Sequence, residues 1–165
     1  MITNSNHFLP KHFREFVQHM NELNVEYLLI GGYAMGAYGH IRATSDLDLF
    51  INASDENAEK MVQVCVNYGI PDEDIKIEMF LVPKMIGIGE PPLRIEILKQ
   101  LGAVDFQYAF QRAVVKEVDN LTINVISLDD LILLKKSAVQ DRNSSRDTED
   151  LSFLQKLKES GIKKK

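Results

Sequence analysis

The stretch from residue 31 to residue 50 reads GGYAMGAYGHIRATSDLDLF and carries the strongest structural signal in the chain. It follows a β-prone run, residues 25–30, that stops abruptly at two glycines and gives way to helix-compatible residues. Residues 46–51 then alternate acidic and apolar side chains, which is the period of a strand with two different faces. The sequence therefore predicts a strand, a glycine turn, a short helix and a second strand with Asp46 and Asp48 on one side.

The segments around this stretch also show helical or strand periodicity. Apolar spacing and capping residues predict helices over residues 8–23, 54–68, 105–113 and 128–138, and a last helix around 151–157 that Gly161 closes. Alternation and turn residues predict strands over 76–82 and 93–98, a hairpin over 114–126 that turns at Asp119-Asn120, and loops over 83–92 and 140–145. Ser127 and Asp130 form a capping-box pattern. We expect an α/β (α+β) fold in which helices flank a mixed central sheet.

Length and composition are typical of a soluble globular protein. The chain has 165 residues, of which 45% are hydrophobic and 26% charged, so we expect a single domain over residues 1–165 with C-terminal helices from about residue 127. The net charge of −5 argues against general binding to duplex DNA. Cys65 is the single cysteine, and we expect it in the core. Because no stretch is long and apolar enough for a membrane span or signal peptide, we expect a cytoplasmic protein without a membrane partner.

Three carboxylates form the candidate metal site. Asp46 and Asp48 lie two residues apart on one predicted strand, and Glu96 lies on the polar face of the strand over residues 93–98. Mg²⁺ prefers oxygen ligands in near-octahedral geometry, and two such ions about 3.5–4 Å apart activate an attacking oxygen and stabilise a leaving one. The sequence predicts that Asp46, Asp48 and Glu96 bind two Mg²⁺ ions, for which Mn²⁺ is a possible substitute.

A phosphate-binding site is predicted next to these carboxylates. Gly31 and Gly32 allow backbone N–H groups to approach phosphate oxygens at the start of a helix. Ser45 directly precedes the first carboxylate, and Arg42 offers a bidentate phosphate contact. We therefore expect these residues to bind a nucleoside triphosphate.

The stretch GGYAMGAYGHIRATSDLDLF resembles the motif of DNA polymerase β-like nucleotidyltransferases, in which a Gly-Gly or Gly-Ser turn precedes an Asp-x-Asp strand. It looks most like the nucleotidyltransferase components of abortive-infection toxin systems and the aminoglycoside nucleotidyltransferases. Further motifs at residues 94–98, 104–106, 125–135 and 146–151 are similar to those of small uncharacterised bacterial nucleotidyltransferases, so the resemblance covers residues 25–157.

This resemblance implies a polymerase β-like nucleotidyltransferase fold and a defined reaction. The enzyme transfers a nucleoside monophosphate from an NTP, most often ATP, to a hydroxyl of a protein, of RNA such as tRNA, or of a small molecule, and releases pyrophosphate. The resemblance places the metal ligands at Asp46, Asp48 and Glu96, with Glu96 also a candidate general base. It places Lys135 and Arg146 near the triphosphate or the acceptor.

Each of these residues also has a purely structural interpretation. Asp46 and Asp48 alone are typical of a solvated sheet face, Gly31-Gly32 of a strand-ending turn, and Lys135 of the last turn of a helix. Glu78 on the preceding predicted strand competes with Glu96. Two departures from the family pattern are Tyr33, where many relatives have Ser, and a Glu instead of Asp as third carboxylate.

Two alternative functions remain at this point. One is a catalytically silent nucleotide-binding or toxin–antitoxin-type module that keeps the fold. The other is an aminoglycoside nucleotidyltransferase-like enzyme, although the chain is short for the additional helical domain that such enzymes use.

Overall fold

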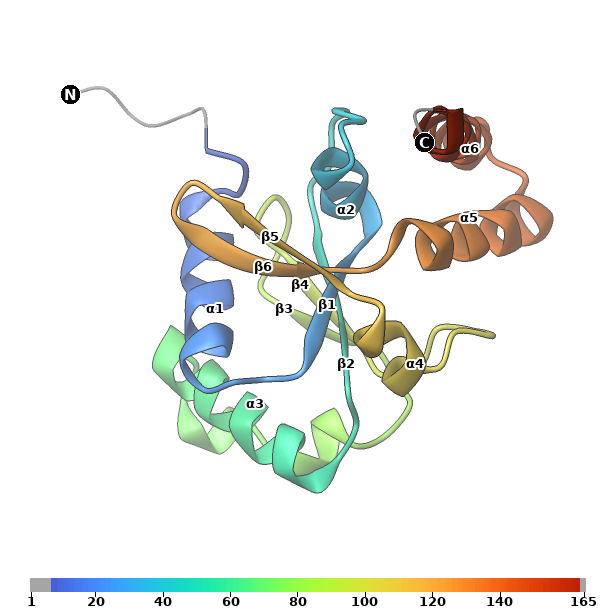
Figure 1. Ribbon diagram of the computed structural model, residues 1–165. Coiled ribbons are helices and arrows are strands. Elements are labelled where there is room, and N and C mark those ends of the chain that lie inside the picture. Colours follow the sequence, from blue (N-terminus) through green and yellow to red (C-terminus); the bar gives the residue numbers. More distant parts are fainter. Residues whose placement is uncertain (1–6, 164–165) are drawn as a thin grey trace.

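The computed structural model describes residues 7–163, and within them six strands form one sheet (Figure 1). The strands lie in the order β3-β4-β2-β1-β6-β5. The pairs β2–β4 and β1–β6 are parallel, and the pairs β1–β2, β3–β4 and β5–β6 are antiparallel. The predicted mixed sheet is therefore confirmed, with strands at β1 (Tyr27–Ile30), β2 (Leu47–Ile51), β3 (Ile86–Ile88), β4 (Ile95–Leu98), β5 (Val114–Val118) and β6 (Leu121–Val125).

Helices lie on both sides of this sheet in the view of Figure 1, with α1 and α3 to its left and the pair α5 and α6 to its right. Within residues 7–163 no helix is both long and apolar enough to cross a membrane. The helices are α1 (Lys11–Glu22), α2 (Gly31–Ala37), α3 (Asp55–Tyr68), α4 (Phe106–Gln111), α5 (Leu128–Arg142) and α6 (Ser145–Lys163), with the short 3₁₀ helices η1 (Asp72–Asp74) and η2 (Ile77–Phe80).

The buried apolar residues form one cluster that extends from α1 through the sheet to α6. Every residue of β1 is buried, and β2 is buried except at Asp48. Cys65 is buried on α3, as predicted. Because β1 and β2 are packed at the centre of the sheet, the one polar side chain of β2 has a rigid backbone beneath it.

Local sequence signals are confirmed where they specify a cap or a turn. The hairpin between β5 and β6 turns at Asp119-Asn120, and both residues have the positive φ that a tight two-residue turn requires. Ser127 caps α5, because its Oγ accepts a hydrogen bond from the backbone N–H of Asp130 at 3.1 Å. The Asp130 carboxylate accepts from the Ser127 hydroxyl in return.

The predicted strand over residues 76–82 and the loop over 83–92 are wrong. Residues 77–80 form the 3₁₀ helix η2, which buries Phe80 and packs against α3. The strand lies later in the chain, at β3, where Gly87 pairs with Glu96. A side chain at Gly87 would overlap the Arg94 guanidinium, so glycine here permits the close approach of Arg94 rather than a flexible loop.

Three helix boundaries also differ from the prediction. The helix α2 begins at Gly31 itself, so the glycine pair forms its first turn instead of preceding it. The helix α5 continues to Arg142, and Asn143 with a φ of 49° ends it, leaving only Asn143 and Ser144 between α5 and α6 where a loop over residues 140–145 was expected. The helix α6 continues past Gly161 to Lys163.

Candidate functional site

Asp48 and Glu96 are adjacent on the two parallel strands at the centre of the sheet. Asp48 of β2 pairs in register with Glu96 of β4, so both side chains point to the same side of the sheet. The Glu96 carboxylate lies close enough to Asp48 for its charge to raise the pKa of Asp48. Arg94, which directly precedes β4, donates from Nε to Glu96 at 3.2 Å. The predicted alternation of β4 is confirmed, since Ile95 and Ile97 are fully buried on its other face.

The surroundings of Asp48 disfavour its charged form. Burial, the charge and hydrogen bond of Glu96, and the charge of Asp46 raise the pKa of Asp48 to about 7, against a smaller opposite effect of Lys135. Its Oδ1 atom is buried and has no hydrogen-bond partner within the described part of the chain. An unpartnered buried carboxylate oxygen beside two other carboxylates fits a divalent cation, which would supply the missing partner and relieve the repulsion.

Asp46 directly precedes β2 and is half-buried. Ser45 donates from Oγ to Asp46 at 3.3 Å, so the two residues are linked to each other in this arrangement. No three His, Cys, Asp or Glu side chains in residues 7–163 already form a closed metal-binding group. Binding of one cation by all three acids would therefore replace the contact of Asp46 with Ser45 and the contact of Glu96 with Arg94 by contacts with the cation.

Gly31 and Gly32 allow the backbone to approach the side chains of β2 and its preceding loop. A Cβ atom at Gly31, whose φ is +72°, would overlap the Asp48 carboxylate, and one at Gly32 would overlap the Thr44 hydroxyl. Both glycines line the same cavity as Asp46 and Asp48. The glycine pair is thus required for close packing around Asp48, in addition to opening backbone N–H groups to the cavity.

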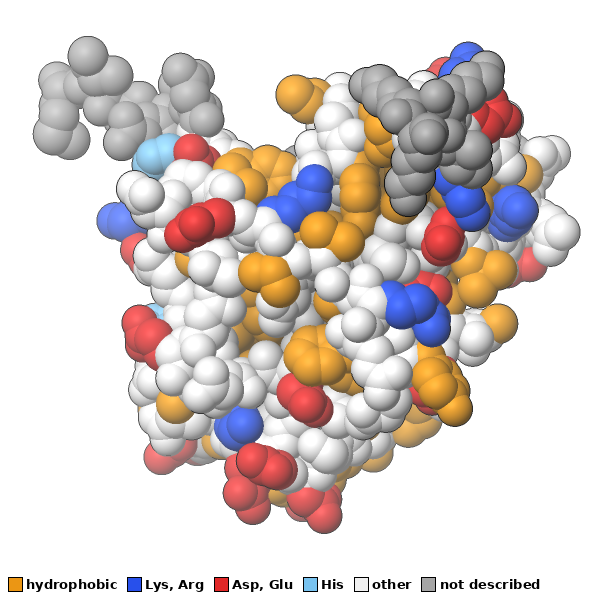
Figure 2. Space-filling view, in the orientation of Figure 1, with side chains coloured by type: hydrophobic (Ala, Val, Ile, Leu, Met, Phe, Trp, Pro, Cys, Tyr) orange, Lys and Arg blue, Asp and Glu red, His pale blue; other side chains and the backbone are white. Residues whose placement is uncertain are grey.

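This cavity has a volume of about 400 Å³ and lies between the acidic end of β2 and the helices α5 and α6. We call its cationic residues the basic side: Arg42, Lys135, Arg142 and Arg146. The face shown in Figure 2 has Lys and Arg side chains mainly toward α5 and α6, whereas acidic side chains gather at its lower end. A chain of net charge −5 therefore still presents local positive charge opposite its carboxylates.

Two members of the basic side are held by a carboxylate of the motif at residues 146–151, to which the sequence analysis assigned no role. Asp150 on α6 is fully buried and accepts from Arg42 through both Nε, at 3.1 Å, and Nη2, at 3.0 Å. Lys135 contacts the same carboxylate at 2.9 Å, and His40 lies 3.3 Å from it. Burial alone would raise the pKa of Asp150, but the hydrogen bonds and charges of Arg42 and Lys135 hold that pKa below its ordinary value.

A second carboxylate, Asp147, forms ion pairs with two residues of the basic side, Lys135 and Arg142. Arg142 contacts it through Nε and Nη2, both at 3.2 Å, and Lys135 lies 3.5 Å from it. Burial opposes ionisation here too, but Ser144, Lys135 and Arg142 lower the pKa of Asp147. Ser144 accepts from the backbone N–H of Asp147, which repeats the Ser-x-x-Asp cap of α5 at the start of α6.

The structure thus brings together most of the residues predicted for the site. Gly31, Gly32, Arg42, Ser45, Asp46, Asp48 and Lys135 line one cavity, and Glu96 contacts Asp48 from the neighbouring strand. Lys135 lies in the middle of α5 and is buried, so its interpretation as a cation of the last helical turn is wrong. Glu78 is exposed on η2 and does not line the cavity.

The sequence analysis assigned no role to five residues of this region: Thr44, Arg142, Ser144, Asp147 and Asp150, of which the last two belong to the motif at residues 146–151. A signal existed for two of them, because Ser144-x-x-Asp147 has the same spacing as Ser127-x-x-Asp130. His40, which the sequence analysis did not assign to the site, contacts Asp150, and its ring packs against that of Phe153 at 4.6 Å between ring centres.

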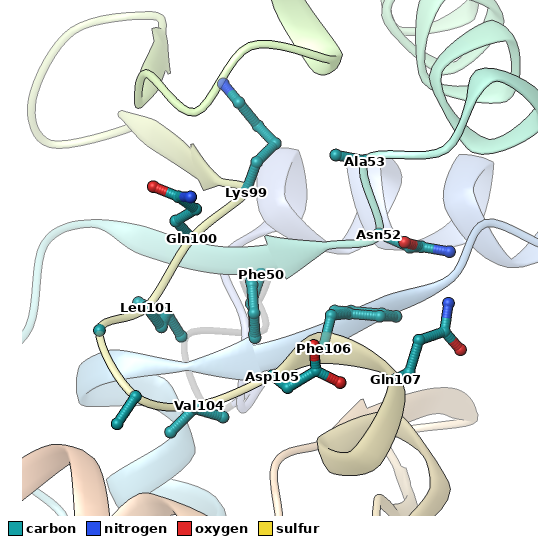
Figure 3. Close-up of a pocket in the computed structure, with 12 residues that line it drawn as sticks. Phe50, Asn52, Ala53, Lys99, Gln100, Leu101, Val104, Asp105, Phe106 and Gln107 are labelled. Atoms are coloured by element: carbon teal, nitrogen blue, oxygen red, sulfur yellow. The ribbon is translucent and has the colours of Figure 1, made fainter.

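A larger cavity of about 500 Å³ lies elsewhere, beyond the ends of β2 and β4 (Figure 3). Its walls are Phe50, Asn52 and residues 99–107, and the one carboxylate among them, Asp105, caps α4 by accepting from the backbone N–H of Tyr108. Figure 3 shows Lys99 pointing away from Phe106, and its ammonium donates to the backbone carbonyl of Lys84. Because it contains none of the predicted site residues, this cavity is not the candidate site.

Comparison with known proteins identifies the family. Residues 10–164 match the model of the family described as nucleotidyl transferase of unknown function (DUF2204). A search of curated proteins finds no match.

Solved structures share the fold at low sequence identity. A lincosamide antibiotic adenylyltransferase, LnuA, solved with lincomycin bound, has a TM-score of 0.60 and 16% identity over 92% of this chain and 99% of its own. An antigenic nucleotidyltransferase-like protein from Paracoccidioides brasiliensis has a TM-score of 0.59 and 16% identity over 86% of this chain and 72% of its own. The antibiotic-resistance factor ANT(2'')-Ia has a TM-score of 0.56 and 13% identity over 87% and 80%. The predicted nucleotidyltransferase fold is confirmed.

Proposed function

Because the chain belongs to this family of nucleotidyl transferases, we propose that it transfers a nucleoside monophosphate from an NTP, ATP in the first instance, to a hydroxyl acceptor and releases pyrophosphate. One observation carries this proposal: Asp48, which has an unpartnered buried oxygen and pairs in register with Glu96, lines together with Asp46 a cavity whose other side is basic. An NTP bound to divalent cations has the complementary charges, because its cations match the acids and its phosphates match the basic side.

We propose that Asp46 and Asp48 hold both metal ions and that Glu96 completes the site. Two bound Mg²⁺ ions would activate the attacking hydroxyl and stabilise the leaving pyrophosphate. The raised pKa of Asp48 supports this assignment. A carboxylate whose charged form is unfavourable in the free protein is stabilised strongly when a cation binds beside it.

The phosphates belong on the opposite side of the cavity. Gly31 and Gly32, which lie beside Asp48 and Thr44, offer backbone N–H groups toward this side, and Ser45 offers a hydroxyl once it leaves Asp46. Arg42 and Lys135 supply fixed positive charge, and Arg142 and Arg146 extend it along α5 and α6. Such preorganised cations stabilise the charge that develops on the transferring group.

Glu96 is the residue proposed to receive the proton of the acceptor hydroxyl. It lies on the β4 side of Asp48, away from the basic side, and about a quarter of its side chain is exposed. A partly accessible carboxylate at this place contacts an acceptor that approaches from the β4 side of the sheet. Its ion pair with Arg94 holds it close to Asp48 until the acceptor arrives.

The decisive experiment measures transfer of label from each α-labelled NTP to protein, RNA and small-molecule fractions of a cell lysate. Asp46→Asn with Asp48→Asn should abolish transfer while the circular dichroism spectrum stays that of the wild type. Asp129→Asn removes an exposed carboxylate of α5 and should keep full activity, which makes it the matched control. Full activity in the double variant would refute the assignment of the carboxylates.

A second candidate function is a catalytically silent nucleotide-binding or toxin–antitoxin-type module. Ion pairs within the protein favour it. Glu96 is paired with Arg94, and both Arg42 and Lys135 are paired with Asp150, so these side chains already have partners without a ligand. Calorimetry with ATP and Mg²⁺, run beside the label-transfer assay, separates the two functions. Tight binding without transfer to any fraction would favour the silent module.

The antibiotic-modifying alternative is tested by the choice of acceptor. The chain spans 99% of the lincosamide adenylyltransferase LnuA, so its short length does not argue against a small-molecule acceptor. Pyrophosphate release should therefore also be measured with lincomycin and with aminoglycosides. Release that depends on the drug would assign a small-molecule acceptor.

A further inference from the structure

The buried contacts of Asp150 join three segments that are far apart in the sequence. Asp150 lies on α6, Lys135 on α5, and Arg42 in the segment between α2 and β2, 108 residues before Asp150. Its carboxylate is fully buried and accepts from both cations. Because a buried carboxylate without partners is strongly unfavourable, these contacts fix the positions of all three groups relative to one another.

The cations that Asp150 holds are the same ones that line the candidate phosphate site. Arg42 presents Nε and Nη2 to Asp150 and Nη1 to the carbonyl of Ala43, so its guanidinium plane is fixed beside the cavity. Lys135 is buried to 8% exposure, and its charge acts on Asp48 on the other side of the cavity. Long basic side chains lose considerable rotamer freedom when they bind a ligand, and this loss is avoided where the protein has already ordered them.

The charge balance shows that Asp150 orders the basic side without neutralising it. Asp147 and Asp150 face four permanent cations, Arg42, Lys135, Arg142 and Arg146. Arg146 has no ion-pair partner within residues 7–163. An excess of positive charge therefore remains for an anionic ligand.

Resting on the proposed function, we propose that Asp150 is a positioning residue that preassembles Arg42 and Lys135 into a triphosphate-binding unit when α6 packs against the domain. Phosphates then meet cations that are already in place, and the carboxylate itself does not touch the ligand. Phe153 one turn further along α6 stacks on His40 and supports the same placement of the helix.

The sign of one binding change tests this inference. Asp150→Asn keeps the shape of the side chain but removes a negative charge next to the site. If only net charge mattered, inorganic tripolyphosphate would bind this variant more tightly. Preassembly predicts the opposite, a Kd about tenfold weaker, equivalent to ~1.4 kcal/mol.

The experiment is calorimetric titration of the full chain with tripolyphosphate in the presence of EDTA, which leaves metal binding out. Asp129→Asn makes the same charge change at the exposed pair with Lys158, which also links α5 and α6, and should bind as the wild type does. Equal or tighter binding by Asp150→Asn overturns this inference alone. No binding by the wild type overturns the phosphate site of the proposed function, and the inference with it.

A measurement on the wild type covers the case in which Asp150→Asn does not fold. Nitrogen-15 NMR of the ligand-free protein should show a distinct, slowly exchanging Arg42 Nε–H resonance, since its acceptor Asp150 is fully buried and the Arg42 side chain is mostly buried. Asp150→Glu, which keeps the charge but displaces it by one methylene, should weaken tripolyphosphate binding in the same direction as Asp150→Asn. A rapidly exchanging Arg42 resonance in the ligand-free wild type would overturn preassembly.

Discussion

Asp48 and Asp150 are both aspartates of the same region, but their surroundings are opposite in charge. Asp48 lines the cavity beside Asp46 and Glu96, its Oδ1 has no partner within residues 7–163, and its pKa is raised to about 7. Asp150 is surrounded by Arg42, Lys135 and His40, and its pKa is lowered. The difference indicates that Asp150 is satisfied by the protein itself, whereas one oxygen of Asp48 is left without a partner in the described part of the protein, as the proposed function expects of a metal ligand.

The largest expected effect concerns the carboxylate next to Asp48. Glu96→Gln keeps a hydrogen-bonding group but removes the proposed base, and should lower kcat by about 10²–10⁴-fold. Binding of tripolyphosphate should stay unchanged, because Glu96 does not line the phosphate side of the cavity. Steady-state kinetics with the identified acceptor give kcat and KM separately.

The matched control for this variant is Glu78→Gln, which changes an exposed glutamate of η2. It should leave kcat within about twofold of the wild type. If Glu78→Gln lowered kcat more than Glu96→Gln, the third carboxylate would be misassigned. The raised pKa of Asp48 could then not be attributed to a catalytic site that includes Glu96.

The next effect tests the statement that Asp150 is satisfied internally. Asp150→Asn removes the partner of two buried cations and should lower the free energy of unfolding by about 3–5 kcal/mol at neutral pH. Since the pKa of Asp150 is lowered in the folded state, its contribution is complete above the ordinary pKa and is lost as pH falls through the folded value. Urea unfolding at pH 7 and pH 3 measures this, and equal losses at both pH values would contradict it.

The fold could be predicted largely because its strongest signals are local. The alternation in β2 and β4 places Asp48 and Glu96 on one side of the sheet, and Ser127 and Asp119-Asn120 mark a cap and a turn through their own backbone contacts. Such signals depend on residues a few positions apart, which a single sequence displays directly.

The errors occur where tertiary contacts decide. The apolar run over residues 76–82 has strand-like composition, but burial of Phe80 against α3 favours η2, and the edge strand forms where Gly87 leaves room for Arg94. The role of Asp150 could not be predicted for the same reason, because its partner Arg42 is 108 residues away and no local pattern links them. The carboxylates of the site could be predicted, but the ordering of its cations could not.

A smaller effect of opposite sign is expected at Asp48. Above pH 7 the wild type keeps Asp48 charged in an unfavourable place, so Asp48→Asn should raise the free energy of unfolding in EDTA. The gain should be about 2 kcal/mol, roughly half of what the pKa shift implies, because the amide of Asn is itself a polar group that costs free energy to bury. The raised pKa means that this penalty is complete above about pH 7, shrinks as pH falls and Asp48 becomes protonated, and is absent below the ordinary value of 3.8. Thermal unfolding at pH 8 and pH 5 should therefore show a gain in Tm that is larger at pH 8.

Destabilisation by Asp48→Asn at pH 8 would contradict the pKa shift and remove the contrast with Asp150. Addition of Mg²⁺ sharpens the same test. The wild type should gain stability from the ion and Asp48→Asn should gain less, because stabilisation by a ligand depends on its affinity for the folded state.

The smallest effect is expected for the exposed pair Asp129–Lys158, which also links α5 to α6, at 2.6 Å. Asp129→Asn should lower the free energy of unfolding by less than about 1 kcal/mol, because both side chains are well exposed and water screens their attraction. Raising the salt concentration should shrink this difference further, whereas the loss in Asp150→Asn should persist, since buried pairs are screened much less. Urea unfolding of both variants at low and high salt compares an exposed and a buried ion pair between the same two helices. If Asp129→Asn lowered the free energy of unfolding as much as Asp150→Asn, the attachment of α6, rather than the ordering of Arg42 and Lys135, would explain the effect of Asp150.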